Sequence, residues 1–177
     1  RVYVIIRRQS GGQIQVGSAG LNGSNVDEVD LIARSVAVNG KILIGTNGGE
    51  YGIRGFIDAY NADSGTRAWR FYTIPAPGEN GSASWPKDSD GWKTGGGATW
   101  MSGSYDPELN LFYYGSGNPG TWNPTQRPGD NKWSMTVFAR DLDTGNAKWA
   151  MQMTPHDEWD YDGINEMILA DQDMNGG

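Results

Sequence analysis

The chain has 177 residues and a net charge of −7, and it is rich in glycine (27) and tryptophan (8) but has no cysteine. The lack of cysteine excludes disulfides and thiolate metal sites, the absence of a basic stripe argues against a nucleic-acid partner, and no apolar run approaches the ~18 residues of a membrane-spanning helix. Many glycines with large aromatic residues are typical of short strands joined by tight turns, with rings packed between sheets. The length suits one domain.

In chain order, the first clear signal is a hairpin. We expect a short strand at residues 2–6, followed by a glycine-rich loop over residues 9–25. Asn39-Gly40 then lies between two apolar runs, and this dipeptide is a strong signal for a two-residue turn between strands. Residues 35–46 are therefore predicted to form a β-hairpin.

The rest of the chain continues as strands and loops, without a predicted helix. Long surface loops are expected at residues 74–97 and 118–131. Residues 171–176 match the first half of a calcium-binding EF-hand loop, but their strand-like flank favours a turn. The further predicted strands are 55–61, 67–73, 110–117, 133–141, 146–153 and 165–171.

Two segments repeat one template. AYNADSGTRAW (59–69) and ARDLDTGNAKW (139–149) share Ala-x-Asp/Asn-x-Asp-Ser/Thr-Gly-x-x-x-Trp. Repeated strand–turn–strand units with a signature tryptophan indicate the stacked sheets of a propeller or a solenoid. The Asp and Ser/Thr side chains can cap the tight turn. We expect Trp69 and Trp149 to pack on the neighbouring sheet, which is a structural role.

The stretch TPHDEWDYDG (154–163) carries four carboxylates and the chain's only histidine, His156. Like charges this dense repel one another, so a cation, hydrogen-bond donors or solvent must offset them. Asp160 and Asp162 would point to one face if the backbone were extended. Two interpretations stay open on these residues alone, namely a solvated acidic loop and a hard-cation site with one carboxylate as a base. His156 has no second His or Cys to share a metal with, which favours a structural role.

Four further segments accompany the repeat. They are GTNGGEYGIRG (45–55), WKTGGGATW (92–100), YGSGNPGTWNPTQRPGDNKW (114–133) and the acidic stretch itself. Together these segments resemble the pyrroloquinoline quinone (PQQ)-dependent alcohol dehydrogenases, and in order and spacing the large subunit of methanol dehydrogenases. The resemblance covers residues 36–177, whereas residues 1–35 match poorly. It implies that residues 1–177 are an all-β internal piece of a longer protein, covering roughly three blades of an eight-bladed β-propeller with tryptophan-docking motifs.

The resemblance also implies a metal and quinone site. Asp160 matches the family's catalytic aspartate, which takes the alcohol proton as general base. Asp162 matches a position at which the lanthanide-dependent branch has Asp and calcium-type methanol dehydrogenases have a small residue. The implied metal ligands are Glu50, Asn118, Asp160 and Asp162, and the implied cofactor-binding residues are Asn47, Gly48, Gly49, Thr99 and Trp100.

The four implied metal ligands offer only oxygen donors, which are the donors that hard cations prefer. The cofactors implied by the resemblance are PQQ as hydride acceptor and a lanthanide ion as Lewis acid, with calcium as the alternative ion. The family further implies a small primary alcohol as substrate, a c-type cytochrome as electron acceptor, a homodimer at full length and a periplasmic location.

Two other classes of protein stay open. A propeller glycosidase would use a pair from Asp157, Glu158 and Asp160 at a set separation across a sugar cleft, which would leave Asn118 and Trp100 without a role. A non-enzymatic scaffold propeller would share the repeats but would not need the four implied metal ligands together. The discriminating observation is whether these four residues converge at one end of the strands.

Overall fold

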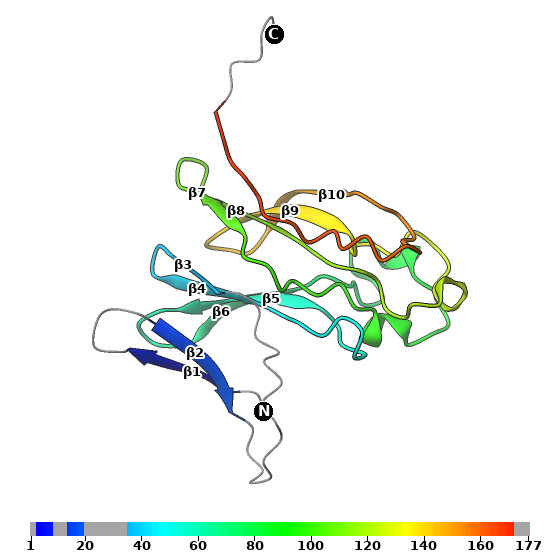
Figure 1. Ribbon diagram of the computed structural model, residues 1–177, viewed down its shortest axis with the longest axis horizontal. Helices are drawn as coiled ribbons and strands as arrows, with labels where there is room; N and C mark the ends of the chain where they lie inside the picture. The colour runs from blue at the N-terminus through cyan, green and yellow to red at the C-terminus, as the bar shows by residue number, and fades with distance from the viewer. Residues whose placement is uncertain (1–2, 9–13, 20–34, 172–177) are drawn as a thin grey trace, which may run out of the picture.

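A computed structural model describes residues 3–8, 14–19 and 35–171 (Figure 1). In these ranges the chain forms strands and three short 3-10 helices (Ser82–Ser84, Gly91–Thr94 and Pro124–Gln126) and no α-helix. The first four-stranded sheet contains β3 (Val36–Val38), β4 (Lys41–Gly45), β5 (Phe56–Asn61) and β6 (Arg67–Tyr72). The second contains β7 (Ser104–Asp106), β8 (Leu111–Gly115), β9 (Thr136–Asp141) and β10 (Ala147–Gln152). A separate hairpin pairs β1 (Tyr3–Arg8) with β2 (Ile14–Ala19).

Each four-stranded sheet is an antiparallel meander in which every strand pairs with its neighbours in sequence, as in a propeller blade. The two sheets pack against each other (Figure 1) and share one core. Tyr114 and Phe138 stack in this core with ring centroids 5.1 Å apart. The buried core residues from both sheets are Leu43, Ile57, Ala59, Phe112, Tyr114, Phe138 and Leu142.

The hairpin predicted over residues 35–46 is confirmed as β3 and β4. Val38 pairs with Lys41, which leaves Asn39 and Gly40 as the two turn residues. Their φ angles are 44° and 71°. A two-residue hairpin turn with both angles positive suits the right-handed twist of the strands, and Asn-Gly is the dipeptide that adopts it most readily.

Two of the predicted elements are wrong, and one strand was missed. The glycine-rich segment predicted as a loop contains β2, whose ladder with β1 runs from Tyr3↔Ala19 to Arg8↔Ile14, because pairing with a neighbour decides strand formation more than composition does. The short strand β7 was not predicted. No strand forms at residues 165–171, where the Met167 carbonyl accepts a hydrogen bond from Ser104 but no β-ladder partner lies alongside. The turn expected at 171–176 lies almost wholly outside the described residues.

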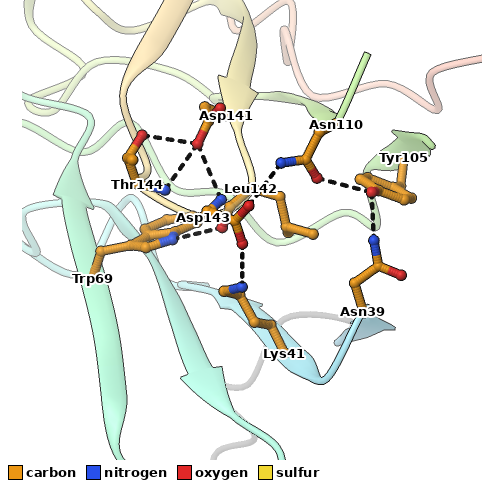
Figure 2. Close-up of polar contacts among 9 residues, drawn as sticks. All are labelled: Asn39, Lys41, Trp69, Tyr105, Asn110, Asp141, Leu142, Asp143 and Thr144. Carbon is orange, nitrogen blue, oxygen red and sulfur yellow. Dashed lines mark hydrogen bonds and ion pairs between the residues drawn. The ribbon is translucent and has the colours of Figure 1, made fainter. Parts of the chain in front are cut away.

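The repeat turns lie at one end of both sheets, which we call the turn end. Asn61 Oδ1 accepts hydrogen bonds from the backbone N–H groups of Asp63 (3.0 Å) and Ser64 (2.9 Å). Asp141 Oδ1 accepts the equivalent bonds from Asp143 (3.1 Å) and Thr144 (2.9 Å), as Figure 2 shows. The capping predicted from the repeat is therefore confirmed, with the Asp/Asn at the third template position as the main acceptor.

Trp69 docks on the turn of the second sheet. Its Nε1–H donates to the Leu142 carbonyl at 2.9 Å (Figure 2), and its ring covers Gly145, where a Cβ atom would lie 2.6 Å from the ring. The predicted packing on a neighbouring sheet is confirmed for Trp69. Trp149 occupies the same template position but is 45% exposed, because no further sheet covers it in the described part of the chain.

Polar contacts join the turn ends of the two sheets. Lys41 Nζ lies 2.6 Å from Asp143 Oδ1, and Asn110 Nδ2 donates to Asp143 Oδ2 at 2.9 Å (Figure 2). The hydrogen bond from Lys41, followed by that from Asn110, lowers the pKa of Asp143. Tyr105 OH accepts from Asn39 Nδ2 at 2.6 Å and donates to Asn110 Oδ1 at 2.9 Å. The turn end is therefore held by a continuous set of satisfied polar groups.

The longer connections all lie at the opposite end of the strands, which we call the loop end. It consists of residues 46–55, 73–103, 116–135 and 153–163. Within the three described ranges, no helix combines the length and the apolar character needed to span a membrane.

Candidate metal and cofactor site

The loop end is built around a glycine-rich segment, residues 95–99. Gly55 N–H donates to Gly96 O and Gly97 N–H donates to Asn118 O, both at 2.8 Å. Gly96 has φ 72°, and a Cβ atom there would lie 2.6 Å from the backbone nitrogen of Gly120. Only glycine allows this approach. The segment thus brings the loop that follows β4 beside the loop that follows β8.

The acidic stretch is attached to the loop after β8. The Asp162 N–H donates to Asn118 Oδ1 at 3.0 Å. Gly163 lies close against Gly115 at the end of β8, where a Cβ atom would be 2.6 Å from the Gly163 carbonyl oxygen. These contacts place Asn118, Asp160 and Asp162 at the loop end, at which Glu50 also lies.

The backbone of the acidic stretch is not extended, so the condition under which Asp160 and Asp162 would share one face of a strand is not met. Their φ angles are 61° and 51°. Aspartate is one of the few residues that tolerates this left-handed region. Side-chain acceptors fix both residues, because Asp157 Oδ2 binds the N–H of Asp160 at 3.2 Å and Asn118 Oδ1 binds that of Asp162 at 3.0 Å.

The implied ligands act on one another electrostatically. Partial burial raises the pKa of the largely exposed Asp162, the negative charges of Asp160 and Glu50 raise it further, and Asn118 opposes the shift. Within the described residues, none of these three carboxylates forms an ion pair, and no three Asp, Glu or His side chains lie close enough to form a ready-made metal cluster. The carboxylates therefore share one region of negative charge without closing on a single point.

Trp100 borders the same region. The point at which Gly117 would carry a Cβ atom is 3.8 Å from Trp100 Nε1 and 3.9 Å from Asp162 Oδ1. The indole is half-buried. The absence of a side chain at Gly117 therefore leaves space between the indole and the Asp162 carboxylate.

The remaining implied cofactor residues fall into two groups. Residues 47–49 form an open turn, in which Asn47 Oδ1 accepts from Gly48 N–H at 2.7 Å and Gly49 faces Ala98. Thr99 has no free hydroxyl, because this buried group accepts from Thr46 N–H at 3.0 Å and donates to the Phe56 carbonyl at 2.6 Å. These bonds give Thr99 a structural role at the end of β4.

Comparisons with known proteins bear on this arrangement. The family model for the PQQ glucose/ethanol/alcohol dehydrogenase β-propeller domain matches residues 10–177. The chain is 54% identical over 160 residues to a lanthanide-dependent methanol dehydrogenase of Methylorubrum extorquens, covering 81% of this chain and 27% of that protein.

The chain belongs to the family of PQQ-dependent glucose/ethanol/alcohol dehydrogenase β-propellers.

Other relatives agree. Subunit 1 of a cytochrome c methanol dehydrogenase from the same species is 45% identical over 156 residues, with 79% of this chain and 25% of that protein covered. A solved europium-containing methanol dehydrogenase superposes with a TM-score of 0.75 at 48% identity, over 82% of this chain and 28% of that one. The all-β propeller class predicted from the sequence is confirmed. The chain spans about a quarter of the length of the curated relatives it matches.

The donors at the loop end fit the hard cation that a PQQ propeller of this kind would hold. Glu50, Asp160 and Asp162 offer carboxylate oxygens and Asn118 offers an amide oxygen, and a hard cation takes six to eight such donors. Within the described residues no basic side chain forms an ion pair with Glu50, Asp160 or Asp162, and after burial the charges of Asp160 and Glu50 raise the pKa of Asp162. A bound cation would supply that balance.

Sequence reasoning missed Arg127 and gave Asp157 only the role of an alternative glycosidase carboxylate. Both are buried, at 4% and 2% exposure. Arg127 donates to the Asn131 side chain at 2.9 Å and to the carbonyls of Thr121 and Asp157 at 2.6 Å. Burial lowers the pKa of Arg127, and the charges of Asp157 and Glu158 oppose this shift. Pattern spacing carries no signal for either residue, because their burial comes from loop packing.

His156 has the structural role expected of it. Its Nδ1 lies 2.8 Å from the Gly129 carbonyl oxygen, and its Nε2 lies 3.4 Å from Glu158 Oε1. The contact with Gly129 ties the start of the acidic stretch to the loop that follows β8, whereas the contact with Glu158 lies within the stretch.

Proposed function

We propose that this chain is the metal- and quinone-binding section of a PQQ-dependent dehydrogenase that oxidises methanol or another primary alcohol to the aldehyde. The hydrogen bond from Asp162 N–H to Asn118 Oδ1 supports this most directly, because it joins two separate ligand loops at one end of the sheets. The charge of Glu50 also raises the pKa of Asp162, which supports the loop that carries Glu50 as the third ligand loop. The 54% identity to a lanthanide-dependent methanol dehydrogenase supports a lanthanide as the ion, with calcium as the alternative.

Each residue has a defined task in this proposal. Glu50, Asn118, Asp160 and Asp162 hold the ion. PQQ, when bound, supplies the hydride acceptor, and the ion supplies Lewis acidity. The Asp160 carboxylate, which is exposed at the loop end, takes the proton from the alcohol oxygen as general base. Asp162 adds a negative charge that suits a trivalent ion better than a divalent one.

Other side chains shape the binding surface. Trp100 would offer a flat apolar face to the quinone, and the turn of Asn47, Gly48 and Gly49 would help to hold it. Thr99 contributes through the backbone of its segment, since its hydroxyl is engaged with Thr46 and Phe56.

The proposal extends to the whole protein. Residues 1–177 would be one section of a propeller domain, of which residues 10–177 match the family model. The partners would be a primary alcohol and a c-type cytochrome, for which the name of the cytochrome c methanol dehydrogenase relative gives support. The full-length protein would be a periplasmic homodimer.

The two competing classes account for fewer observations. A glycosidase pair needs two carboxylates facing a cleft, but Asp157 is buried and bonded to the backbone of Asp160. A scaffold propeller needs no concentration of unpaired carboxylates at the loop end.

The experiment is dye-linked methanol oxidation by the full-length protein, purified without cofactors and reconstituted with PQQ and either lanthanum or calcium. We expect turnover only with both PQQ and metal, and more with lanthanum than with calcium. Metal-independent turnover, or glycoside hydrolysis by the same preparation, would refute the proposal.

A further inference from the structure

Asp157 is an unusual buried carboxylate beside the proposed base. Its side chain is 2% exposed and forms no ion pair within the described residues. One oxygen, Oδ2, accepts the backbone N–H of Asp160 at 3.2 Å. The other, Oδ1, is buried without a hydrogen-bond partner. Leaving a buried polar atom unpaired costs about 1–3 kcal/mol, and more when the atom is charged, so the group calls for an explanation.

A second unpaired atom lies at the same place. Asn118 Nδ2 is also buried without a partner, although Oδ1 of the same amide binds Asp162. Asn118, Arg127, Asp157 and Asp160 all line one small open pocket of about 30 Å³. A volume of this size holds a single water molecule. Waters bound at polar sites of this kind bridge polar groups that otherwise have no partner.

We infer that Asp157 is a positioning residue for Asp160, acting through its hydrogen bond to the Asp160 N–H and through one water that bridges Asp157 Oδ1 and Asn118 Nδ2. The water donates to the carboxylate and accepts from the amide. This assignment satisfies both orphaned atoms and connects the loop of the base to the loop of a ligand. It rests on the proposed function, because it gives Asp160 the role of base and ligand.

The physical consequence is control of an unfavourable backbone conformation. Asp160 has φ 61°, a region that costs a non-glycine residue of order 1–3 kcal/mol unless the surroundings impose it. The acceptor at Asp157 fixes the N–H of Asp160 in that conformation. Arg127 donates a hydrogen bond to the backbone carbonyl of Asp157 at 2.6 Å and places a positive charge near it. Both interactions help to keep the Asp157 carboxylate in place. Loss of the acceptor would release the Asp160 carboxylate from its position.

The test uses the full-length protein with three variants. Asp157→Ala removes the acceptor, and Asp157→Asn keeps it. Asp58→Ala is the matched control, because Asp58 is equally buried, at 1%, but pairs with Arg70 at 2.5 Å in the first sheet, away from the loop end. The measurements are the dissociation constant for terbium from sensitised luminescence, kcat and KM for methanol at saturating lanthanum, and the melting temperature.

We expect Asp157→Ala to weaken terbium binding and lower kcat by about 10- to 100-fold each, with a smaller change in KM for methanol. Asp157→Asn should stay within about threefold of wild type, since an amide oxygen still accepts the Asp160 N–H. Asp58→Ala should lower only the melting temperature.

The outcomes separate this inference from the proposed function. Wild-type protein that binds terbium, beside an Asp157→Ala variant with unchanged terbium affinity and kcat, would overturn the positioning role and leave the proposed function intact. An Asp157→Asn variant as impaired as Asp157→Ala would also overturn it, because charge rather than the hydrogen bond would then matter. An Asp157→Ala variant that does not fold, beside an unaltered Asp157→Asn variant, would assign Asp157 to the fold alone. Wild-type protein that binds no terbium would refute the proposed metal site, and this inference with it.

Discussion

The polar groups at the turn end of the two sheets are paired, whereas several at the loop end are not. Asn61 and Asp141 each accept backbone hydrogen bonds within their turns, and Asp143 binds both Lys41 and Asn110. At the loop end, Asn118 Nδ2 and Asp157 Oδ1 are buried without partners.

The two ends also differ in the ionisation of their carboxyl groups. The pKa of Asp143 at the turn end is lowered by the hydrogen bond from Lys41, whereas the pKa of Asp162 at the loop end is raised by burial and by the charges of Asp160 and Glu50. In a stabilising turn, neighbouring groups pair with the charged side chains. In a ligand site, the charged side chains stay unpaired until the ligand binds. The comparison therefore assigns stability to the turn end and function to the loop end, and each prediction below tests that division.

The largest expected effect is on turnover. In the full-length protein, Asp160→Asn should lower kcat for methanol by about 10³-fold, because general base catalysis contributes 10²–10⁴-fold. At saturating lanthanum, the bound metal and the melting temperature should stay close to wild type, since an amide oxygen can still coordinate even though the lost charge lowers the affinity. The measurement is dye-linked oxidation with metal analysis of the same sample. An equal fall in melting temperature would place Asp160 among the stabilising residues and break the division.

The second prediction compares the two tryptophans of the repeat. Trp69→Ala should lower the free energy of unfolding of this chain by about 3 kcal/mol, because it leaves a cavity over Gly145 and an unpaired Leu142 carbonyl. Trp149→Ala is the matched control at the same template position, and because its side chain is 45% exposed it should cost less than about 1 kcal/mol. Urea unfolding of both variants gives the difference, and equal losses would contradict the docking role.

The third prediction concerns the ion. Asp162→Ala should weaken lanthanum binding to the full-length protein by about 10- to 100-fold and calcium binding by less, because one negative charge is removed from around the ion. Competition titration with both metals measures the ratio. A ratio equal to that of wild type would remove the basis for a lanthanide rather than calcium.

A smaller effect is expected from the cap of the second repeat turn. Asp141→Ala removes the acceptor of two backbone N–H groups and should cost about 1 kcal/mol of stability, as loss of a comparable cap does. Asp141→Asn retains the acceptor and serves as the control. Methanol turnover per folded molecule should be the same in both, and a selective loss of turnover would be evidence against a purely structural turn end.

The smallest effect is a pH dependence at the loop end. A carboxyl group whose pKa is raised by folding favours the folded state below its unfolded pKa of about 4 and opposes it as the pH rises through the folded value. In the metal-free protein, Asp162→Asn should therefore raise stability at pH 7 by a few tenths of a kcal/mol, since the exposed side chain is screened by solvent. The gain should vanish below about pH 4. Thermal unfolding at both pH values measures it, and a gain that persists at low pH would exclude an electrostatic cause.

Much of the fold follows from local chemistry. Asn39-Gly40 specifies its turn through two residues that accept positive φ angles, and the Ala-x-Asp motif specifies the repeat turns through neighbouring donors and acceptors. By contrast, β2 and the unpaired segment 165–171 depend on whether a distant strand lies alongside, which no local pattern contains.

The candidate site divides in the same way. Motif matching predicts Asn118, Asp160 and Asp162, and the structure joins their loops through a hydrogen bond between residues far apart in sequence. Motif matching could not predict the left-handed backbone at Asp160 or the burial of Asp157 and Arg127, because both follow from the packing of loops against one another.

The central claim is that Glu50, Asn118, Asp160 and Asp162 hold one hard cation. The most direct test is a crystal structure of the full-length protein with PQQ and europium, with diffraction recorded at the europium absorption edge. We predict one anomalous peak at the loop end, about 2.3–2.6 Å from oxygen atoms of these four residues. A peak coordinated by other residues, or no peak in protein that oxidises methanol, would contradict the claim.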